Sequence, residues 1–359
     1  MSFEQYFAAS PFALVADREA ARHWSGRPKA LLAIQRLLGG MQTRPDSTVD
    51  VIWASFGAGK THTLYYLINH LDEAKNICGV VEAPDQIKRF HDLYKLFMQT
   101  LPLDRMAQSM LKHARQDTPQ NLRRAAQLIV NGNSAEKSLA LQWLCGERPN
   151  LNDLRRVANI SARIEDDIGA VEALSALVRC FASAGVRVCM LIDEYQRIGK
   201  LPERVRVPIT SSLRTIISKN PKGFSIVLSI TSLIEKTALE MVPNELKTII
   251  GIRPVINLPP LSEEEALEFV KDRFQYCRPP GFSGKPFEPF TKETVETCIR
   301  FLAKTEKFSL TPRLILQTLG EVFDQQIIQT NLLSSNEALK EFLSQRNGSQ
   351  TVMDESLQS

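Results

Sequence analysis

Residues 49–71 read VDVIWASFGAGKTHTLYYLINHL, and this stretch decides the fold. The apolar run at residues 51–53 predicts a buried strand. A small, glycine-bearing loop follows at residues 54–61, and leucine and isoleucine then recur at helical spacing as far as Leu71. A strand, a glycine loop that ends in Lys-Thr, and a helix, in that order, predict a P-loop.

The chemistry of phosphate binding explains these residue types. Gly57 and Gly59 allow a tight turn that brings backbone N–H groups close to phosphate oxygens, and the helix start adds its positive end. We expect Lys60 to reach the β- and γ-phosphates of ATP and the Thr61 hydroxyl to hold Mg²⁺. Ala54 replaces the usual first glycine and is small enough for the loop to survive. The alternative is an ordinary Gly-Lys-Thr turn at a helix start.

Composition restricts the protein class more than the function. The chain has 359 residues, 43% of them hydrophobic and 23% charged, and a formal charge of +4, which is too mild to imply nucleic-acid binding by itself. Its six cysteines form no C-x-x-C pair, so we expect buried thiols in a reducing compartment. No apolar run approaches the ~18 residues of a membrane helix, and the N-terminus does not resemble a signal peptide. We expect a cytoplasmic protein with no membrane partner.

A second motif lies at residues 186–194, which read VRVCMLIDE and predict a buried strand that ends in two carboxylates. At the carboxyl end of a central strand, Asp193 would hold the Mg²⁺ shell. Glu194 would polarise the attacking water as a general base. Many strands end in acids, so this run indicates a nucleotide site only together with the upstream P-loop.

The remaining apolar runs predict the α/β class. Strands are expected at residues 77–81, 224–230 and 254–258, which makes a P-loop NTPase with a parallel five-stranded sheet flanked by helices. We expect an N-terminal helical segment at 1–40 that packs on the core, and an α/β nucleotide-binding domain at 41–260 with a helical insertion at about 102–165. A C-terminal helical lid at 261–345, opened by a capping box of Ser262 and Glu265, and a disordered tail at 346–359 would follow.

Basic residues gather after the second motif, because seven of them lie between residues 197 and 222 and only Glu203 opposes them. One interpretation is a solvated helix face. The other is a surface that contacts the phosphate backbone of double-stranded DNA. The segment lacks aromatic residues, which argues against base stacking on single strands. The candidate nucleic-acid contacts are Arg197, Lys200, Arg204, Arg206 and Arg214.

Taken together, these motifs resemble the AAA+ ATPases, close to the initiator clade that includes origin-recognition proteins and transposon target-selection ATPases. The resemblance covers roughly residues 10–325. Residues 24–27, Trp-Ser-Gly-Arg, are similar to the N-terminal Gly-Arg box of the family, which lies near the adenine. Asp193-Glu194 is similar to Walker B, Thr231-Ser232 to sensor 1, and Thr311-Pro312-Arg313 to sensor 2.

The resemblance implies ATP hydrolysis with ATP and Mg²⁺ as cofactors, in a homo-oligomeric ring or filament. It implies that Arg313 contacts the γ-phosphate and that a neighbouring subunit supplies an arginine finger, for which Arg253 is our candidate. The catalytic candidates are therefore Glu194, Lys60, Ser232, Arg313 and Arg253. The nucleotide-binding candidates are Gly57, Ala58, Gly59, Lys60, Thr61, His62 and Arg27, and the metal candidates are Thr61 and Asp193. For His62, a helix-face position with no ligand is the alternative.

The helical insertion departs from the initiator pattern. Residues 143–146, Trp-Leu-Cys-Gly, and the later Leu-Arg-Arg look loosely like ATP-binding proteins of bacterial phage-exclusion and related defence systems. Packing alone also explains the leucine spacing there. Too few residues follow the lid for the winged helix that initiators usually carry. Any DNA contact is therefore expected from the ATPase core or from a partner.

Three functional hypotheses remain open. The first is an ATP-hydrolysing switch that oligomerises and acts on or near DNA, like an initiator or loader, in a mobile-element or phage-defence system. The second is a nucleotide-dependent interaction switch that recruits a protein effector, such as a neighbouring gene product, with slow turnover and no DNA contact. The third is a nucleotide kinase or other P-loop transferase, which the Asp193-Glu194 pair and the absence of an acceptor motif disfavour.

Overall fold

The five predicted strands are present in a computed structural model of the chain, which describes residues 3–116, 118–250, 255–304, 310–328 and 338–345. They are β1 (Thr48–Ala54), β2 (Asn76–Glu82), β3 (Arg187–Asp193), β4 (Phe224–Thr231) and β5 (Ile256–Asn257). They form one sheet in the order β2-β3-β4-β1-β5, and every pairing is parallel. The predicted parallel α/β sheet is confirmed.

The register of the sheet brings its chemically important ends together. Glu82 pairs with Asp193 across β2 and β3, and Ala54 pairs with Thr231 across β1 and β4. All carboxyl ends of a parallel sheet lie at one edge, so the last residues of these strands share that edge. Every residue of β3 is buried, as expected of a central strand with both faces covered.

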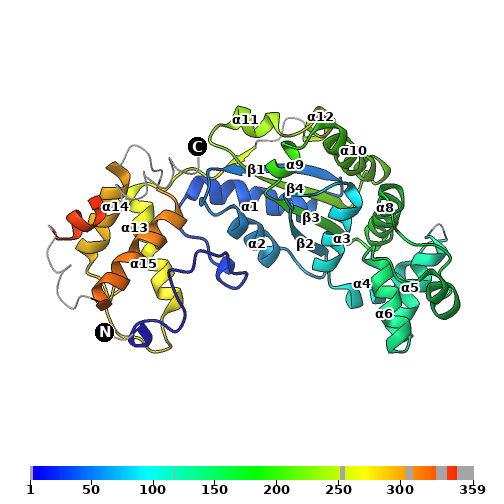
Figure 1. Cartoon of the computed structure of the whole chain (residues 1–359), viewed down its shortest axis with the longest axis horizontal. Helices are drawn as coiled ribbons and strands as arrows, with labels where there is room; N and C mark the ends of the chain where they lie inside the picture. Colours follow the sequence, from blue (N-terminus) through cyan, green and yellow to red (C-terminus); the bar gives the residue numbers. More distant parts are fainter. Residues whose placement is uncertain (1–2, 117, 251–254, 305–309, 329–337, 346–359) are drawn as a thin grey trace. The chain divides into compact units, whose positions relative to one another are not determined.

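Helices surround this sheet (Figure 1). The helices of this part of the chain are α1 (Pro28–Thr43), α2 (Lys60–His70), α3 (Phe90–Thr100), α8 (Asp167–Ser183), α9 (Gln196–Gly199), α10 (Glu203–Lys219), α11 (Glu235–Glu240) and α12 (Asn244–Ile250). Helix α3 packs against β2, α8 against β3 and α12 against β1. Helix α10 covers α8 and α12, so it presents its outer face to solvent.

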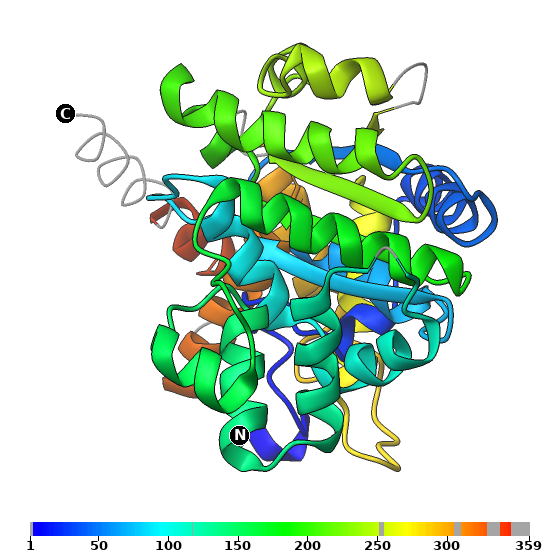
Figure 2. The same cartoon turned by 90° about the vertical axis from the view of Figure 1, so that its right-hand side faces the viewer.

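The predicted insertion consists of α4 (Leu103–His113), α5 (Gln120–Asn131), α6 (Ser134–Leu144) and α7 (Leu151–Asp153), followed by a π-helix at Leu154–Ala158. Figures 1 and 2 show α4, α5 and α6 side by side. Trp143, Leu144 and Leu154 belong to the same hydrophobic core as the sheet. Packing therefore accounts for the leucine spacing of this segment.

The chain divides into two compact units, which we describe separately. The larger comprises residues 32–54 and 63–257 and holds the sheet and the insertion. The smaller contains residues up to Leu31, the loop at residues 55–62, and the chain from Leu258 onward. Its helices are α13 (Glu263–Cys277), α14 (Lys292–Lys304) and α15 (Pro312–Ile328), with a further helical stretch at residues 338–345.

The N-terminal segment packs within the smaller unit. Phe7 is buried in the same hydrophobic cluster as Phe274 of α13, Phe323 of α15 and Phe290, which precedes α14, and Arg278 stacks over the Phe7 ring at 4.6 Å. This division differs from the one expected from the sequence, which placed residues 1–40 as a separate segment on the nucleotide-binding core. The reason is the row of aromatic side chains in residues 3–12, whose partners lie in the lid.

Two further expectations fall outside the described residues, namely the disordered tail at 346–359 and the finger candidate Arg253. Across the described ranges, no helix is both long enough and apolar enough to span a membrane.

Candidate functional site

The P-loop has the predicted local geometry. The loop leaves β1 after Ala54, and α2 begins at Lys60. Gly57 and Gly59 have φ angles of +74° and +96°, in the region that favours glycine. Lys60 is 5% exposed, and its Nζ donates to the Ser55 carbonyl at 3.2 Å, so the loop closes over its own lysine. Ala54 is still paired within the sheet, so this position does not need the conformational freedom of glycine.

Arg27 of the Gly-Arg box contacts this loop directly. Its Nη1 donates to the Ala58 carbonyl at 2.6 Å, and its backbone N–H donates to Glu265 Oε1 at 2.9 Å. The side chain is 6% exposed, and burial lowers the pKa of its guanidinium to about 10, against the opposing effect of Glu265. The group is therefore charged at neutral pH although it is removed from water.

The sensor 2 candidate, Arg313, contacts the neighbouring loop residues Phe56 and Gly57. The Arg313 backbone N–H donates to the Gly57 carbonyl at 3.3 Å, and its guanidinium lies 4.5 Å from the centre of the Phe56 ring. A Cβ atom at position 57 would stand only 2.9 Å from Arg313 Cβ, so α15 packs against the glycine itself. Arg27 and Arg313 therefore both contact residues of this loop, and their roles toward a nucleotide stay predictions.

His62 has a structural partner. Its Nε2 lies 3.0 Å from the His23 carbonyl, and burial lowers the pKa of the imidazole. A neutral ring whose Nε2 carries the proton can donate to that carbonyl. This contact ties residues 23–27 to the start of α2. It matches the helix-face interpretation, and a nucleotide contact by His62 stays a prediction.

The second motif lies at the carboxyl end of β3. Asp193 is 3% exposed, and its Oδ1 accepts from Ser229 Oγ at 2.7 Å and from the Glu194 N–H at 3.0 Å. Glu194 has a φ of +53°, which is unusual for a side-chain-bearing residue and turns the chain sharply away from the strand. The Asp193 carboxylate is therefore oriented by Ser229 and by the Glu194 N–H.

Glu194 is held by two residues, one of which the sequence did not indicate. Gln196 Nε2 donates to Glu194 Oε2, and Thr231 Oγ1 donates to Glu194 Oε1 at 3.3 Å. Gln196 Oε1 in turn accepts from the Thr231 N–H at 2.9 Å, which closes a three-residue network. Only the position of Gln196, two residues after the acid, could have suggested this role.

The two residues of the sensor 1 pair, Thr231 and Ser232, have different hydrogen-bond partners, which the sequence did not predict. The Ser232 hydroxyl donates to the Ile234 carbonyl at 2.8 Å and stabilises its own turn. The adjacent Thr231 is the residue whose hydroxyl reaches Glu194. In this structure, contact with the candidate base therefore comes from Thr231, and a catalytic role of Ser232 stays a prediction.

Mg²⁺ needs oxygen ligands, and the residues predicted to bind it carry them. The Asp193 carboxylate and the Thr61 hydroxyl are suitable donors beside phosphate oxygens and water. In the part of the chain that the structure describes, no cluster of three or more histidine, cysteine or acidic side chains could hold a metal by itself. The donor set therefore fits an ion that is bound together with a nucleotide.

The basic residues of this segment differ in their surroundings, because some have ion-pair or hydrogen-bond partners and others are exposed. Arg197 forms ion pairs with Glu82 and Asp85 at 3.0 and 3.1 Å, and Arg206 donates to the Gly199 carbonyl at 3.1 Å. These two arginines have structural partners. Lys200 and Arg204 are exposed.

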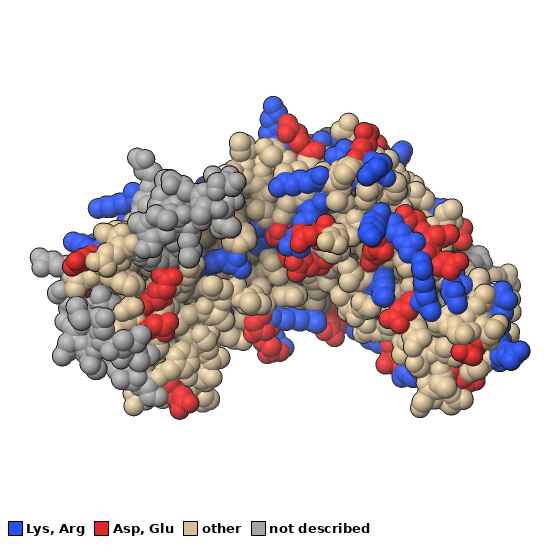
Figure 3. Space-filling model, viewed as in Figure 1, with Lys and Arg blue, Asp and Glu red and all other residues tan. Residues whose placement is uncertain are grey.

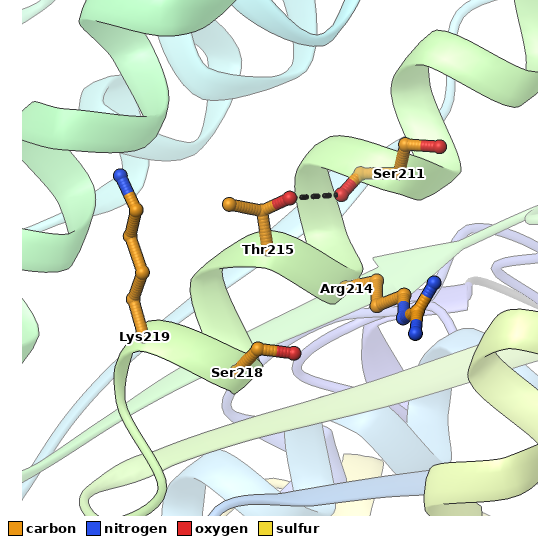
Figure 4. A pocket seen from close by; sticks show the side chains of 5 residues that line it. All are labelled: Ser211, Arg214, Thr215, Ser218 and Lys219. Carbon is orange, nitrogen blue, oxygen red and sulfur yellow. Dashed lines mark hydrogen bonds between the residues drawn. The ribbon is translucent and has the colours of Figure 1, made fainter.

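The outer face of α10 carries further basic residues of the segment. Arg214 is exposed and borders a shallow hollow together with Ser211, Thr215, Ser218 and Lys219, whose side chains project from the helix in different directions (Figure 4). Figure 3 shows basic side chains over this part of the surface interspersed with acidic ones. Within α10 itself, Glu203 is the one acidic residue beside Arg204, Arg206, Arg214 and Lys219, so the helix is predominantly basic.

The chain is similar to known proteins over part of its sequence and in its fold. Residues 103–232, just over a third of the chain, match the family model described as BREX system ATP-binding protein BrxC/D. The matched stretch runs from the insertion through Asp193-Glu194 to Ser232. No curated protein matches the chain.

The fold is similar to those of solved ORC proteins and of a Walker-type ATPase. The ORC2 protein of Aeropyrum pernix, in ADPNP–ADP complexes, has 13% identity and a TM-score of 0.52, with 88% of this chain and 65% of that chain covered. A Walker-type ATPase of Pyrococcus abyssi has 12% identity and a TM-score of 0.51, with 97% and 79% covered. Drosophila ORC bound to DNA has 13% identity and a TM-score of 0.50, with 94% and 63% covered. At such identities the likeness establishes the fold, and the chain spans less than two thirds of the length of the first of these proteins.

Proposed function

We propose that this chain is an ATP-binding and ATP-hydrolysing AAA+ switch that oligomerises and acts on or near DNA, as initiators or loaders do. The observation that carries the proposal is the convergence of Arg27 and Arg313 on one P-loop. Two guanidinium groups against a phosphate-binding loop suit a polyanion such as a triphosphate. The match to a BREX ATP-binding family supports a place in a phage-defence or mobile-element system.

The proposed chemistry assigns one task to each group. Lys60 and Arg313 neutralise the charge that develops on the γ-phosphoryl oxygens during in-line attack by water. Glu194 orients that water and accepts its proton. Mg²⁺, when bound, supplies positive charge to the phosphate oxygens, and Thr61 and Asp193 would hold it. Thr231 and Gln196 keep the Glu194 carboxylate oriented between turnovers.

The first test is ATP hydrolysis by the purified protein, with and without double-stranded DNA, at roughly 50 and 200 mM salt. We expect hydrolysis that DNA stimulates and that salt suppresses. Lys60→Ala is the matched control, because it removes the phosphate-contacting amine and should abolish nucleotide binding. If DNA does not change the rate of ATP hydrolysis at either salt concentration, the proposed action on DNA is contradicted.

A second candidate function is a nucleotide-dependent switch that recruits a protein effector, with slow turnover and no DNA contact. The pairing of Arg197 with Glu82 and Asp85, and of Arg206 with the Gly199 carbonyl, favours it, because these arginines already have partners. Tight ATP binding with slow hydrolysis and no response to DNA would support this candidate over the first.

A further inference from the structure

Arg27 is a buried, charged side chain of the smaller unit. Its side chain is 6% exposed, yet Nε and Nη2 have no hydrogen-bond partner among the residues that the structure describes. Only Nη1 has one, the Ala58 carbonyl. A buried charge with unmet donors is costly, so such groups are normally paired or bind a ligand.

The surroundings of this guanidinium point to an anion as the missing partner. It lies against the P-loop, where a Cβ atom built on Gly59 would come within 4.0 Å of Nη1. The loop leads directly into α2, whose first N–H groups favour negative charge. Glu265, the nearby carboxylate, is engaged through the Arg27 backbone N–H rather than through the guanidinium.

Glu265 also links this arginine to the lid. Its Oε2 accepts from the Ser262 N–H at 2.9 Å, and Ser262 Oγ accepts from the Glu265 N–H at 3.1 Å, which forms the predicted capping box of α13. Its Oε1 holds the backbone of Arg27, which has a left-handed φ of +49°. One carboxylate therefore fixes both the first turn of α13 and the strained backbone that aims Arg27 at the loop.

We propose that Arg27 binds the phosphate chain of the nucleotide through Nε and Nη2, and that Glu265 is a positioning residue that couples this contact to the first helix of the lid. The inference rests on the proposed nucleotide binding and deepens it. The resemblance alone implies a place near the adenine for this box. Phosphate recognition is a different assignment and makes a different prediction for a ligand that has no base.

The test is calorimetric titration of the full chain with ADP and, separately, with inorganic pyrophosphate. Arg27→Gln should weaken both ligands by a similar factor, about 10- to 100-fold, as expected for the loss of hydrogen bonds from a charged group. Arg27→Lys retains the charge but lacks the forked donors, so it should fall between wild type and Arg27→Gln. Arg22→Gln is the matched control, because Arg22 is an exposed arginine of the same segment that pairs with Glu19. It should leave both affinities unchanged.

The role of Glu265 is tested by a double-mutant cycle. Glu265→Ala should weaken pyrophosphate binding by a smaller factor than Arg27→Gln does. The double variant should bind no more weakly than Arg27→Gln alone, because Glu265 acts through Arg27. Additive losses would show that Glu265 acts independently and would overturn the coupling.

The outcomes separate this inference from the proposed function. If Arg27→Gln weakens ADP but leaves pyrophosphate binding unchanged, Arg27 serves the adenine and the inference is overturned, while nucleotide binding stands. If wild-type protein binds neither ligand, the proposed function itself fails. Circular dichroism of each variant shows whether it is folded, and Arg27→Lys provides the comparison if Arg27→Gln is not.

Discussion

At the scale of single residues, the fold holds Glu194 in an unusual backbone conformation and orients its carboxylate. Its φ of +53° places it in a region that costs a side-chain-bearing residue roughly 1–2 kcal/mol, and the Gln196 and Thr231 network holds it there. We predict that Glu194→Gln lowers the rate of ATP hydrolysis by at least ~100-fold while ATP affinity changes little, because the amide cannot accept the proton of water. Turnover by this variant at the wild-type rate, measured as phosphate release, would exclude Glu194 as the base.

A second prediction at this scale concerns Gly57. Its Cβ position stands 2.9 Å from Arg313 Cβ, and its φ is +74°, so Gly57→Ala should both strain the loop and displace α15. Gly281→Ala is the matched control, since Gly281 has a φ of +80° but no atom within 4 Å of its Cβ position. We expect both variants to lower the free energy of unfolding by about 1 kcal/mol or more. Only Gly57→Ala should weaken ATP binding in a calorimetric titration, and equal affinities for the two variants would contradict this account.

At the scale of elements, the N-terminal segment behaves as part of the lid. Phe7 is 2% exposed and packs edge-on against Phe274 and Phe12. Phe7→Ala should lower the stability of the smaller unit by about 3–5 kcal/mol, as truncation of a buried aromatic ring does. Leu14→Ala, at a side chain that is 40% exposed, should have little effect. Thermal unfolding followed by circular dichroism measures both, and equal melting temperatures would show that the segment is not part of the lid core.

Helix α10 carries the exposed Arg214, one of the predicted DNA contacts. If its outer face contacts phosphate, Arg214→Gln should weaken DNA binding and reduce the slope of log affinity against log salt by about 0.9. Arg197→Gln should leave that slope unchanged, because Arg197 already pairs with Glu82 and Asp85. Fluorescence anisotropy with labelled duplex DNA over a range of salt concentrations measures both slopes. The same change for both variants would mean that the ion pairs of Arg197 open on DNA.

At the scale of the whole molecule, we predict that two copies of the chain contribute residues to one active site. If Arg253 completes the site of a neighbouring subunit, Glu194→Gln and Arg253→Ala should each be inactive alone. Mixing them should restore activity, because the intact base of one variant then meets the intact finger of the other. The phosphate release of the mixture, compared with that of each variant, measures this complementation. An inactive mixture that still co-assembles in sedimentation would exclude Arg253 as the finger.

Most of the fold could be predicted from the sequence, because its signals are local. A strand followed by Gly-Ala-Gly-Lys-Thr and a helix, and a buried run ending in Asp193-Glu194, specify their elements through residues that are neighbours in the chain. The capping box of Ser262 and Glu265 was predictable for the same reason, and the structure contains it.

Contacts between distant residues needed the tertiary structure. Arg27 and Glu265 are 238 positions apart, and no periodicity connects them. The aromatic residues at 3–12 pack against partners in the lid, which are far away in the sequence. Likewise, Arg197 looked like its basic neighbours until the fold brought Glu82 and Asp85 to it. By itself the sequence determined the motifs and the sheet that carries them, because these depend on short-range order. The tertiary structure alone decided which charged side chains pair within the protein and which can bind a ligand, because pairing depends on which side chains the folded chain brings together.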